Sequence, residues 1–120
     1  MSKHIFITGG AGFIGSHTAE RLLKRGDRVT AIDAFDYGYD PRLKEQNANI
    51  LNAYEGFRLV KGDIRDAELL NELFAEDKPD VVIHLAARAG VRPSLLEPDS
   101  YSDINITGTI RILEAMRAQN

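Results

Sequence analysis

The chain has 120 residues, of which 43% are hydrophobic, and its 15 lysines and arginines against 18 aspartates and glutamates give a formal net charge of −3. This length suits one domain with a buried core, and the slightly acidic, interleaved charges exclude a basic surface for nucleic acid. The absence of cysteine excludes disulfides, thiol nucleophiles and cysteine-ligated zinc, and is consistent with a cytoplasmic protein. No apolar run approaches the roughly 18 residues of a membrane helix, and no metal site is expected.

Short β-branched or apolar runs alternate with longer segments of helical periodicity. In chain order we predict a strand at 4–8, a helix from 13 to about 25, a strand at 28–33, a loop at 34–40, a short helix from 41 into the early fifties, a strand at 57–61, a helix at 66–74, a turn at 78–80, a strand at 81–85, a loop from 86 and a long helix from about 99 to 119. This order implies parallel strands with right-handed crossovers, and therefore an α/β fold with a doubly wound sheet. The last strand is apolar at almost every position, which predicts burial on both faces.

Three glycines stand between the first predicted strand and the first predicted helix. Gly9, Gly12 and Gly15 have the spacing G-x-x-G-x-x-G. Glycines so placed permit a tight turn, the approach of backbone N–H groups to a pyrophosphate, and close packing of helix on strand. The helix N-terminus adds unpaired N–H donors and the positive end of its dipole. The pattern predicts a nucleotide-binding loop, and the alternative is a structural turn that needs glycine for its own geometry.

An acidic residue, Asp33, ends the second predicted strand, 18 residues beyond Gly15. A carboxylate at this place accepts hydrogen bonds from the adenosine ribose hydroxyls and repels a 2′-phosphate, which favours NAD over NADP. Ala34 and Phe35 follow it, so no arginine directly beside it contradicts this preference. The alternative is a solvated loop aspartate or a helix cap.

Four motifs together resemble the extended short-chain dehydrogenase/reductase family, the NAD-dependent epimerases and dehydratases. They are Thr-Gly-Gly-Ala-Gly-Phe-Ile-Gly at 8–15, Gly-Asp-Ile-Arg-Asp at 62–66, His-Leu-Ala-Ala at 84–87 and Asn-Ile-Thr-Gly-Thr at 105–109. Within that family, residues 39–44 and 86–94 are most similar to UDP-glucuronate 4-epimerases and next to UDP-glucose 4-epimerases. The resemblance covers essentially the whole chain. It implies a Rossmann-like sheet of strand order 3-2-1-4, NAD as cofactor and a nucleotide sugar as substrate.

The resemblance also implies roles for single residues. Asp63 would accept a hydrogen bond from the adenine amine, unless it is only a turn or cap residue before the helix at Asp66. Small residues at the end of the fourth strand would let the cofactor pass close to the backbone. The implied cofactor-binding residues are Gly9, Gly12, Phe13, Ile14, Gly15, Asp33, Asp63, Ile64, Leu85, Ala86, Ala87, Arg88 and Asn105.

Within this set, Asn105 would contact the nicotinamide half of the cofactor, and Arg88 would border the pyrophosphate. Arg92 and Ser94 are hypothesised to touch the nucleotide sugar. Either arginine could instead be a solvated loop charge. His84 is interpreted as a structural residue of a buried strand and not as a catalytic acid or base.

Family members move a proton with a Tyr-x-x-x-Lys pair, helped by a serine or threonine, while hydride passes to NAD. The tyrosines at 37, 39, 54 and 101 are followed four residues later by Pro41, Leu43, Arg58 and Asn105, so this pair does not occur. No catalytic residue is therefore predicted. We expect residues 1–120 to be the N-terminal NAD-binding portion of a longer enzyme, truncated before the fifth strand and inactive alone.

Two functional classes remain open from the sequence. The first is the NAD-binding portion of a nucleotide-sugar 4-epimerase, with a dehydratase or reductase of the same fold as its competitor within the class. The second is an NAD-binding sensor or module without catalysis. Truncation would leave the strand at 81–85 as an open, apolar edge, which predicts self-association through that edge. Neither nucleic acid nor membrane is expected as a partner.

Overall fold

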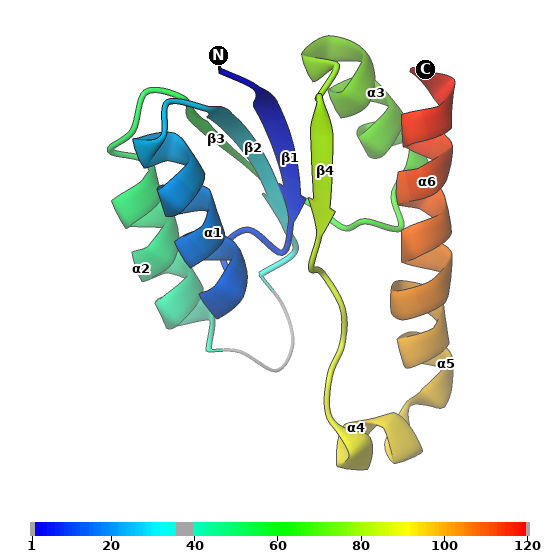
Figure 1. Cartoon of the computed structure of the whole chain (residues 1–120). Coiled ribbons are helices and arrows are strands. Elements are labelled where there is room, and N and C mark those ends of the chain that lie inside the picture. The colour runs from blue at the N-terminus through cyan, green and yellow to red at the C-terminus, as the bar shows by residue number, and fades with distance from the viewer. Residues whose placement is uncertain (1, 36–39, 120) are drawn as a thin grey trace.

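The computed structural model describes residues 2–35 and 40–119, which form a parallel four-stranded sheet between two helical layers (Figure 1). The strand order is β3-β2-β1-β4, which confirms the predicted order 3-2-1-4. The elements are β1 (His4–Thr8), α1 (Phe13–Lys24), β2 (Arg28–Asp33), α2 (Pro41–Leu51), β3 (Phe57–Lys61), α3 (Ala67–Asp77), β4 (Val81–His84), α4 (Val91–Leu96), α5 (Pro98–Ser102), the π-helix η1 (Asp103–Thr107) and α6 (Gly108–Ala118).

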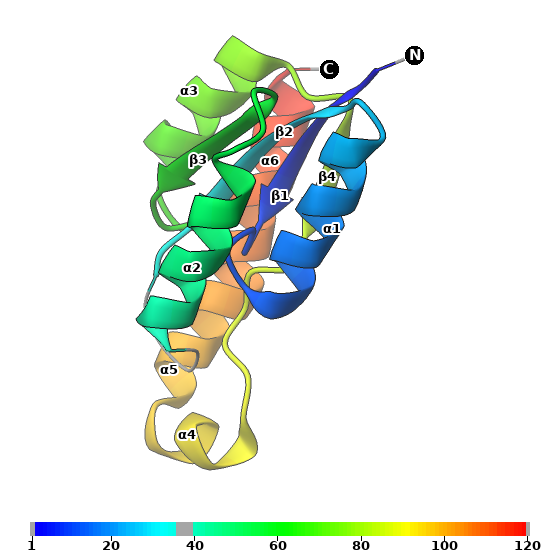
Figure 2. The same cartoon turned by 90° about the vertical axis from the view of Figure 1, so that its left-hand side faces the viewer.

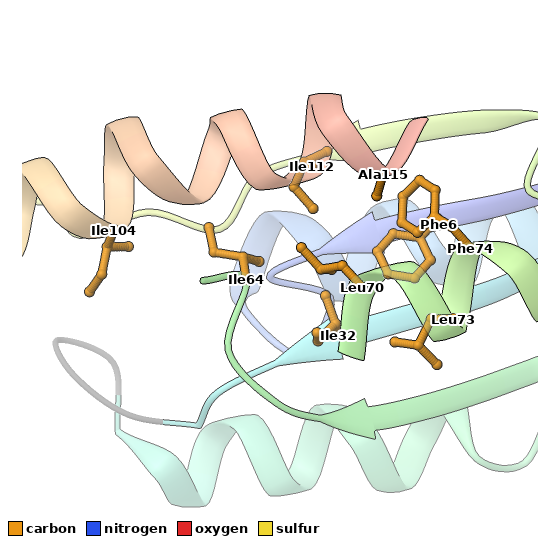
Figure 3. Close-up of a cluster of buried hydrophobic side chains, with 9 residues drawn as sticks. All are labelled: Phe6, Ile32, Ile64, Leu70, Leu73, Phe74, Ile104, Ile112 and Ala115. Atoms are coloured by element: carbon orange, nitrogen blue, oxygen red, sulfur yellow. The ribbon is translucent and has the colours of Figure 1, made fainter. Parts of the chain in front are cut away.

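The central strand β1 supplies both cores, because successive side chains of a strand point to opposite faces. Ile5 and Ile7 pack with Leu23 and Leu51 in the cluster under α1 and α2. Phe6 lies in the other cluster, under α3 and α6, where its ring centroid is 4.6 Å from that of Phe74 (Figure 3). The two helical layers therefore cover opposite faces of one sheet, as the two views of the ribbon show (Figures 1 and 2).

The predicted burial of the fourth strand on both faces is wrong for this chain. All five residues of β1 are buried, whereas no residue of β4 is, and Val81 is 37% exposed. The reason is position, because β1 pairs with β2 and β4, whereas β4 pairs with β1 only within the described residues. An apolar run indicates that a strand is suited to burial. Whether the strand is buried depends on the strands and helices that pack beside it.

The segment after β4 differs most from prediction. Residues 86–98, predicted as a loop, contain the six-residue helix α4, and Pro98 opens α5 at its first turn. The predicted long helix is present but is interrupted by η1. In Figure 1 an extended segment carries α4 and α5 far below the sheet before α6 returns along it. In the part of the chain that the structure describes, no helix is long and apolar enough to cross a membrane.

Candidate dinucleotide-binding site

The glycine loop forms the turn between β1 and α1, and two of its glycines are required by the protein's own geometry. Gly9 has a φ of +71°, in the left-handed region that glycine adopts without strain. A Cβ on Gly15 would lie 2.1 Å from the carbonyl oxygen of Gly9, so α1 can approach β1 this closely only with glycine there. The predicted turn and the predicted helix-to-strand packing are both present.

Gly12 is different, because no neighbour forces it to be glycine. A Cβ there would meet only the Gly9 carbonyl oxygen, at an ordinary 3.4 Å, and its φ of −73° suits any residue. Gly12 nevertheless lines a cavity of about 310 Å³ at the carboxyl ends of the strands. Its missing side chain thus leaves space that a ligand, and not the protein, can use.

Most of the predicted cofactor residues come together around this cavity. Its lining includes Gly9, Gly12, Asp33, Asp63, Ile64, Leu85, Ala86, Ala87 and Arg88. Ligands of open α/β sheets bind in the crevice outside the carboxyl ends of the strands, which is where this cavity lies. The arrangement brings residues from the ends of all four strands to one site.

The Asp33 carboxylate accepts hydrogen bonds from three different residues. Its Oδ2 accepts from the Ala11 N–H at 3.1 Å, and its Oδ1 accepts from the Phe35 N–H at 2.9 Å. Oδ1 also accepts from Lys44 Nζ at 2.8 Å. Asp33 is only 4% exposed, so the alternative of a solvated loop aspartate is wrong.

Helix α2 contributes two residues that the sequence analysis missed. Lys44 lines the cavity beside Asp33, and its side chain is 12% exposed. One turn further on, Asn47 Nδ2 donates to the Ala11 carbonyl oxygen at 2.8 Å, so α2 fastens the glycine loop as well. Of the motif at 39–44, Tyr39 lies outside the described residues, as does Tyr37. The similarity of residues 39–44 to the family was the signal that could have pointed to Lys44.

Asp63 and Ile64 lie at the end of β3, on the far side of the cavity from the glycine loop. Asp63 is held by Arg65, whose Nη2 donates to Oδ2 at 2.6 Å and whose backbone N–H donates to Oδ1 at 2.8 Å. The side-chain hydrogen bond from Arg65 lowers the pKa of Asp63 below its ordinary value, so the carboxylate stays ionised as an acceptor. Arg65 Nη1 also donates to Asp103 on η1 at 2.8 Å. The helix-capping residue here is Asp66, which accepts from the Leu69 N–H.

Residues 85–88 form the cavity wall after β4, and we call them the β4 strip. Asn105 holds its end, because Oδ1 accepts from the Arg88 N–H at 2.8 Å and Nδ2 donates to the Arg88 carbonyl oxygen at 3.0 Å. The Arg88 guanidinium donates to Ser100 Oγ and lies 3.8 Å from Glu97. Arg88 is thus bound to α5 and is no solvated loop charge. Asn105 itself is not part of the cavity lining, and it contacts the β4 strip through these two hydrogen bonds.

The remaining predicted residues lie outside the cavity. Phe13 and Ile14, in the first turn of α1, expose more than 60% of their surface, and Gly15 lies beneath them. Arg92 and Ser94 are on α4, where Ser94 Oγ donates to the Val91 carbonyl oxygen. Within residues 2–35 and 40–119 no cluster of His, Cys, Asp or Glu could hold a metal ion.

Two described tyrosines have structural partners. Tyr54 donates its hydroxyl hydrogen to Glu20 at 3.2 Å, and Tyr101 donates to the Ala89 carbonyl oxygen at 2.8 Å. Burial raises the pKa of Tyr54, which is opposite to what a tyrosine acting as a base requires. These contacts give both tyrosines a structural role.

Known proteins similar to this chain include UDP-glucuronate and UDP-glucose 4-epimerases. UDP-glucuronate 4-epimerase 1 of Arabidopsis thaliana is 44% identical over 97% of this chain and 27% of its own length. The UDP-glucuronate 4-epimerase of Thermodesulfobacterium geofontis is also 44% identical, over 95% of this chain and 35% of its own. The crystal structure of UDP-glucose 4-epimerase from Bifidobacterium longum in complex with NAD+ and UDP is 34% identical, with a TM-score of 0.83 over 98% of this chain and 34% of that one.

This chain thus spans about a quarter to a third of the length of the relatives that it matches. The similarity to the epimerase and dehydratase family that its motifs predicted is confirmed by relatives and structures alike. Residues 6–120 also match the family model described as GDP-mannose 4,6 dehydratase, which is nearly the whole chain. The chain therefore belongs to the GDP-mannose 4,6 dehydratase family.

Proposed function

We propose that this chain is the NAD-binding portion of a nucleotide-sugar 4-epimerase. The observation that carries the proposal is the cavity at the sheet's carboxyl edge, whose lining combines the open space above Gly12 with the acidic groups Asp33 and Asp63. Similar structures include a UDP-glucose 4-epimerase crystallised with NAD+ and UDP. Bound NAD supplies a hydride acceptor, and then a hydride donor, for the sugar C4 carbon.

Each wall of the cavity has a part in this proposal. The N–H groups at the start of α1 face the pyrophosphate across Gly12. Asp33 accepts from the adenosine ribose, and Lys44, with two donors left after its bond to Asp33, donates to the same ribose. Asp63 accepts from the adenine amine beside Ile64, and Arg88 borders the pyrophosphate. The β4 strip forms the wall on the nicotinamide side, with Asn105 behind it, while Arg92 and Ser94 of α4 belong to the sugar side.

Catalysis belongs, in this proposal, to the part of the enzyme that supplies the Tyr-x-x-x-Lys pair. Residues 1–120 form the NAD-binding Rossmann domain, and alone they bind cofactor without turning over substrate. The family description as a dehydratase favours one second candidate, a nucleotide-sugar 4,6-dehydratase of the same fold. The cysteine-free composition supports a cytoplasmic location.

Calorimetric titration of the protein with NAD, with NADP as the comparison, tests the proposal. We expect NAD to bind more tightly than NADP, and Gly12→Val to abolish binding by filling the space for the pyrophosphate. Gly12→Val should remain folded, because a Cβ at this position meets only the Gly9 carbonyl oxygen, and its thermal unfolding curve is the control for loss of structure. Failure of both nucleotides to bind the folded parent protein would refute the proposal.

We also propose that the chain self-associates through β4, with a second copy as the partner. The outer edge of β4 has no strand beside it among the described residues, and Val81 presents an exposed apolar side chain there. Unpaired, uncharged edges recruit other strands, and lysine on an edge opposes this. Light scattering should show association that rises with concentration and that Val81→Lys abolishes. A monomer at millimolar concentration would contradict this part of the proposal.

A further inference from the structure

A buried hydroxyl at the end of β1 holds the start of the β4 strip. The N–H groups of Leu85 and Ala86 donate to Thr8 Oγ1 at 2.9 and 3.0 Å, and that of Leu85 is shared with the Thr8 carbonyl oxygen at 3.2 Å. Thr8 is fully buried. A hydroxyl oxygen accepts two hydrogen bonds and donates one. With both acceptor positions taken, Thr8 has only its hydrogen left to give.

That hydrogen determines the protonation of His84. Thr8 Oγ1 lies 2.6 Å from His84 Nδ1, so Thr8 donates and Nδ1 accepts. An accepting Nδ1 carries no hydrogen, and the proton of the neutral ring is therefore on Nε2. Nε2 lies 2.9 Å from Thr109 Oγ1, which is the partner that such a donor needs.

The hydrogen-bond network continues from His84 into α6 and η1. Thr109 Oγ1 accepts from His84 and donates to the Asn105 carbonyl oxygen at 2.7 Å. Asn105 in turn bonds the backbone of Arg88 through both ends of its side-chain amide. The start of the β4 strip is thus fixed by Thr8 and its end by Asn105, and His84 connects the two through Thr109.

We infer that His84 is a positioning residue of the cofactor site: its neutral Nε2–H form ties β1 to α6, and through Thr109 to η1, and so keeps the β4 strip in the shape that binds NAD. This inference rests on the proposed NAD binding. His84 touches no cofactor in this scheme and acts only through the strip. The uncharged hydroxyls of Thr8 and Thr109 face its ring from β1 and α6, and no ion pair to His84 occurs within residues 2–35 and 40–119.

Protonation of His84 would disrupt this hydrogen-bond network at Nδ1. Nδ1 would become a donor that points at Thr8 Oγ1, whose acceptor positions are filled by the strip. Either the strip's N–H groups or the imidazolium must then give up a hydrogen bond. Burial lowers the pKa of His84 below its ordinary value, which agrees with an environment that favours the neutral ring. NAD affinity should therefore be full while the ring is neutral and should fall as the pH drops through the pKa of His84, which lies below its ordinary value.

The test has one arm that needs no cofactor. Long-range ¹H–¹⁵N correlation spectra of protein labelled at histidine report which ring nitrogen carries the proton. At pH 7.5 we expect His84 to be neutral with its proton on Nε2. A proton on Nδ1, or a charged ring, would overturn the inference whether or not NAD binds.

The second arm measures the dissociation constant of NAD between pH 7.5 and pH 5. We expect it to rise by at least about threefold in the parent protein, with proton uptake as NAD is released. His84→Asn and His84→Gln, which cannot titrate, should flatten this dependence. His4→Gln is the matched control, because His4 is a buried histidine of the neighbouring strand β1 that also bonds a threonine hydroxyl, Thr30, and it should leave the dependence intact.

Substitution of Thr109 separates positioning from titration. Thr109→Val keeps the shape but removes the acceptor for Nε2, and should weaken NAD binding roughly 3- to 10-fold at pH 7.5, while Thr109→Ser should restore it. A pH dependence that persists in both His84 variants would overturn the inference. Absence of NAD binding at every pH would instead refute the proposed function, and the spectra would still decide whether the hydrogen-bonding scheme exists.

Discussion

The two sides of the cavity differ in how fully the chain's own residues pack around them. On the side that we propose binds adenosine, Asp33 accepts hydrogen bonds from three donors, and Asp63 accepts hydrogen bonds from Arg65. Beyond β4, helix α4 has no buried residue, and Leu95 and Leu96 expose 76% and 81% of their surface. The chain's own packing therefore completes the proposed adenosine side, whereas the proposed sugar side presents apolar side chains that no described residue covers. Adenosine recognition should accordingly be a property of this chain alone.

The largest effect on stability should come from a substitution that crowds the glycine loop. Gly15→Ala places a Cβ 2.1 Å from backbone, which cannot move aside as a flexible side chain would. We expect a loss of about 3 kcal/mol in the free energy of unfolding, measured by urea denaturation. Gly12→Ala, with its nearest neighbour at 3.4 Å, is the control and should lose at most about 1 kcal/mol. Equal losses would contradict the different origins assigned to these two glycines.

A second prediction concerns the charge on the adenosine side. Lys44 partly neutralises Asp33, and in the proposed binding mode its ammonium would lie beside a 2′-phosphate on the ribose. Lys44→Met should therefore weaken NADP more than NAD and raise the ratio of their dissociation constants about tenfold, as titration calorimetry would measure. Lys61→Met removes a mostly exposed lysine that pairs with Glu45, and should leave the ratio unchanged. An unchanged ratio in Lys44→Met would show that Asp33 alone selects the cofactor.

These residues also mark the limit of what the sequence could predict. The strand, glycine loop and helix from His4 to Lys24 are a local pattern, and Asp33 follows from its place at a strand end. Lys44 could not be found in this way, because its contact with Asp33 depends on how α2 packs beside the glycine loop. The role of His84 likewise requires three elements, β1, β4 and α6, to be placed in space.

The segment beyond β4 was predicted least well, for two physical reasons. Helix α4 is six residues long and contains Pro93, so no helical period is visible. The apolar run of β4 reads as a buried strand, although burial depends on neighbours that a local pattern does not contain. The interruption η1 has no sequence signature either, yet it carries Asn105, the residue that holds Arg88.

A smaller effect should follow from breaking the bridge between Asp63 and η1. Because Arg65 lowers the pKa of Asp63, the pair stabilises the folded protein above about pH 3.8 and loses this contribution as the pH falls through the lowered value. Both side chains are one-third exposed, so after allowance for solvent screening we expect Arg65→Gln to cost about 0.5–1 kcal/mol at pH 7 and less at pH 3. Urea denaturation at the two pH values measures this. Arg117→Gln, which breaks the exposed pair with Glu114, should cost less at pH 7.

The smallest effect on stability should come from a substitution in α4, on the side of the cavity whose apolar side chains are exposed. Leu96→Ser removes an apolar side chain that buries little surface in the folded protein, so the free energy of unfolding should change by less than about 0.5 kcal/mol. Leu70→Ala, at a fully buried leucine of α3, should cost about 2–5 kcal/mol in the same urea experiment. A loss above 1 kcal/mol in Leu96→Ser would mean that α4 is covered in solution. If that loss grew with protein concentration, the cover would be a second copy of the chain, and the sugar side would be completed by association.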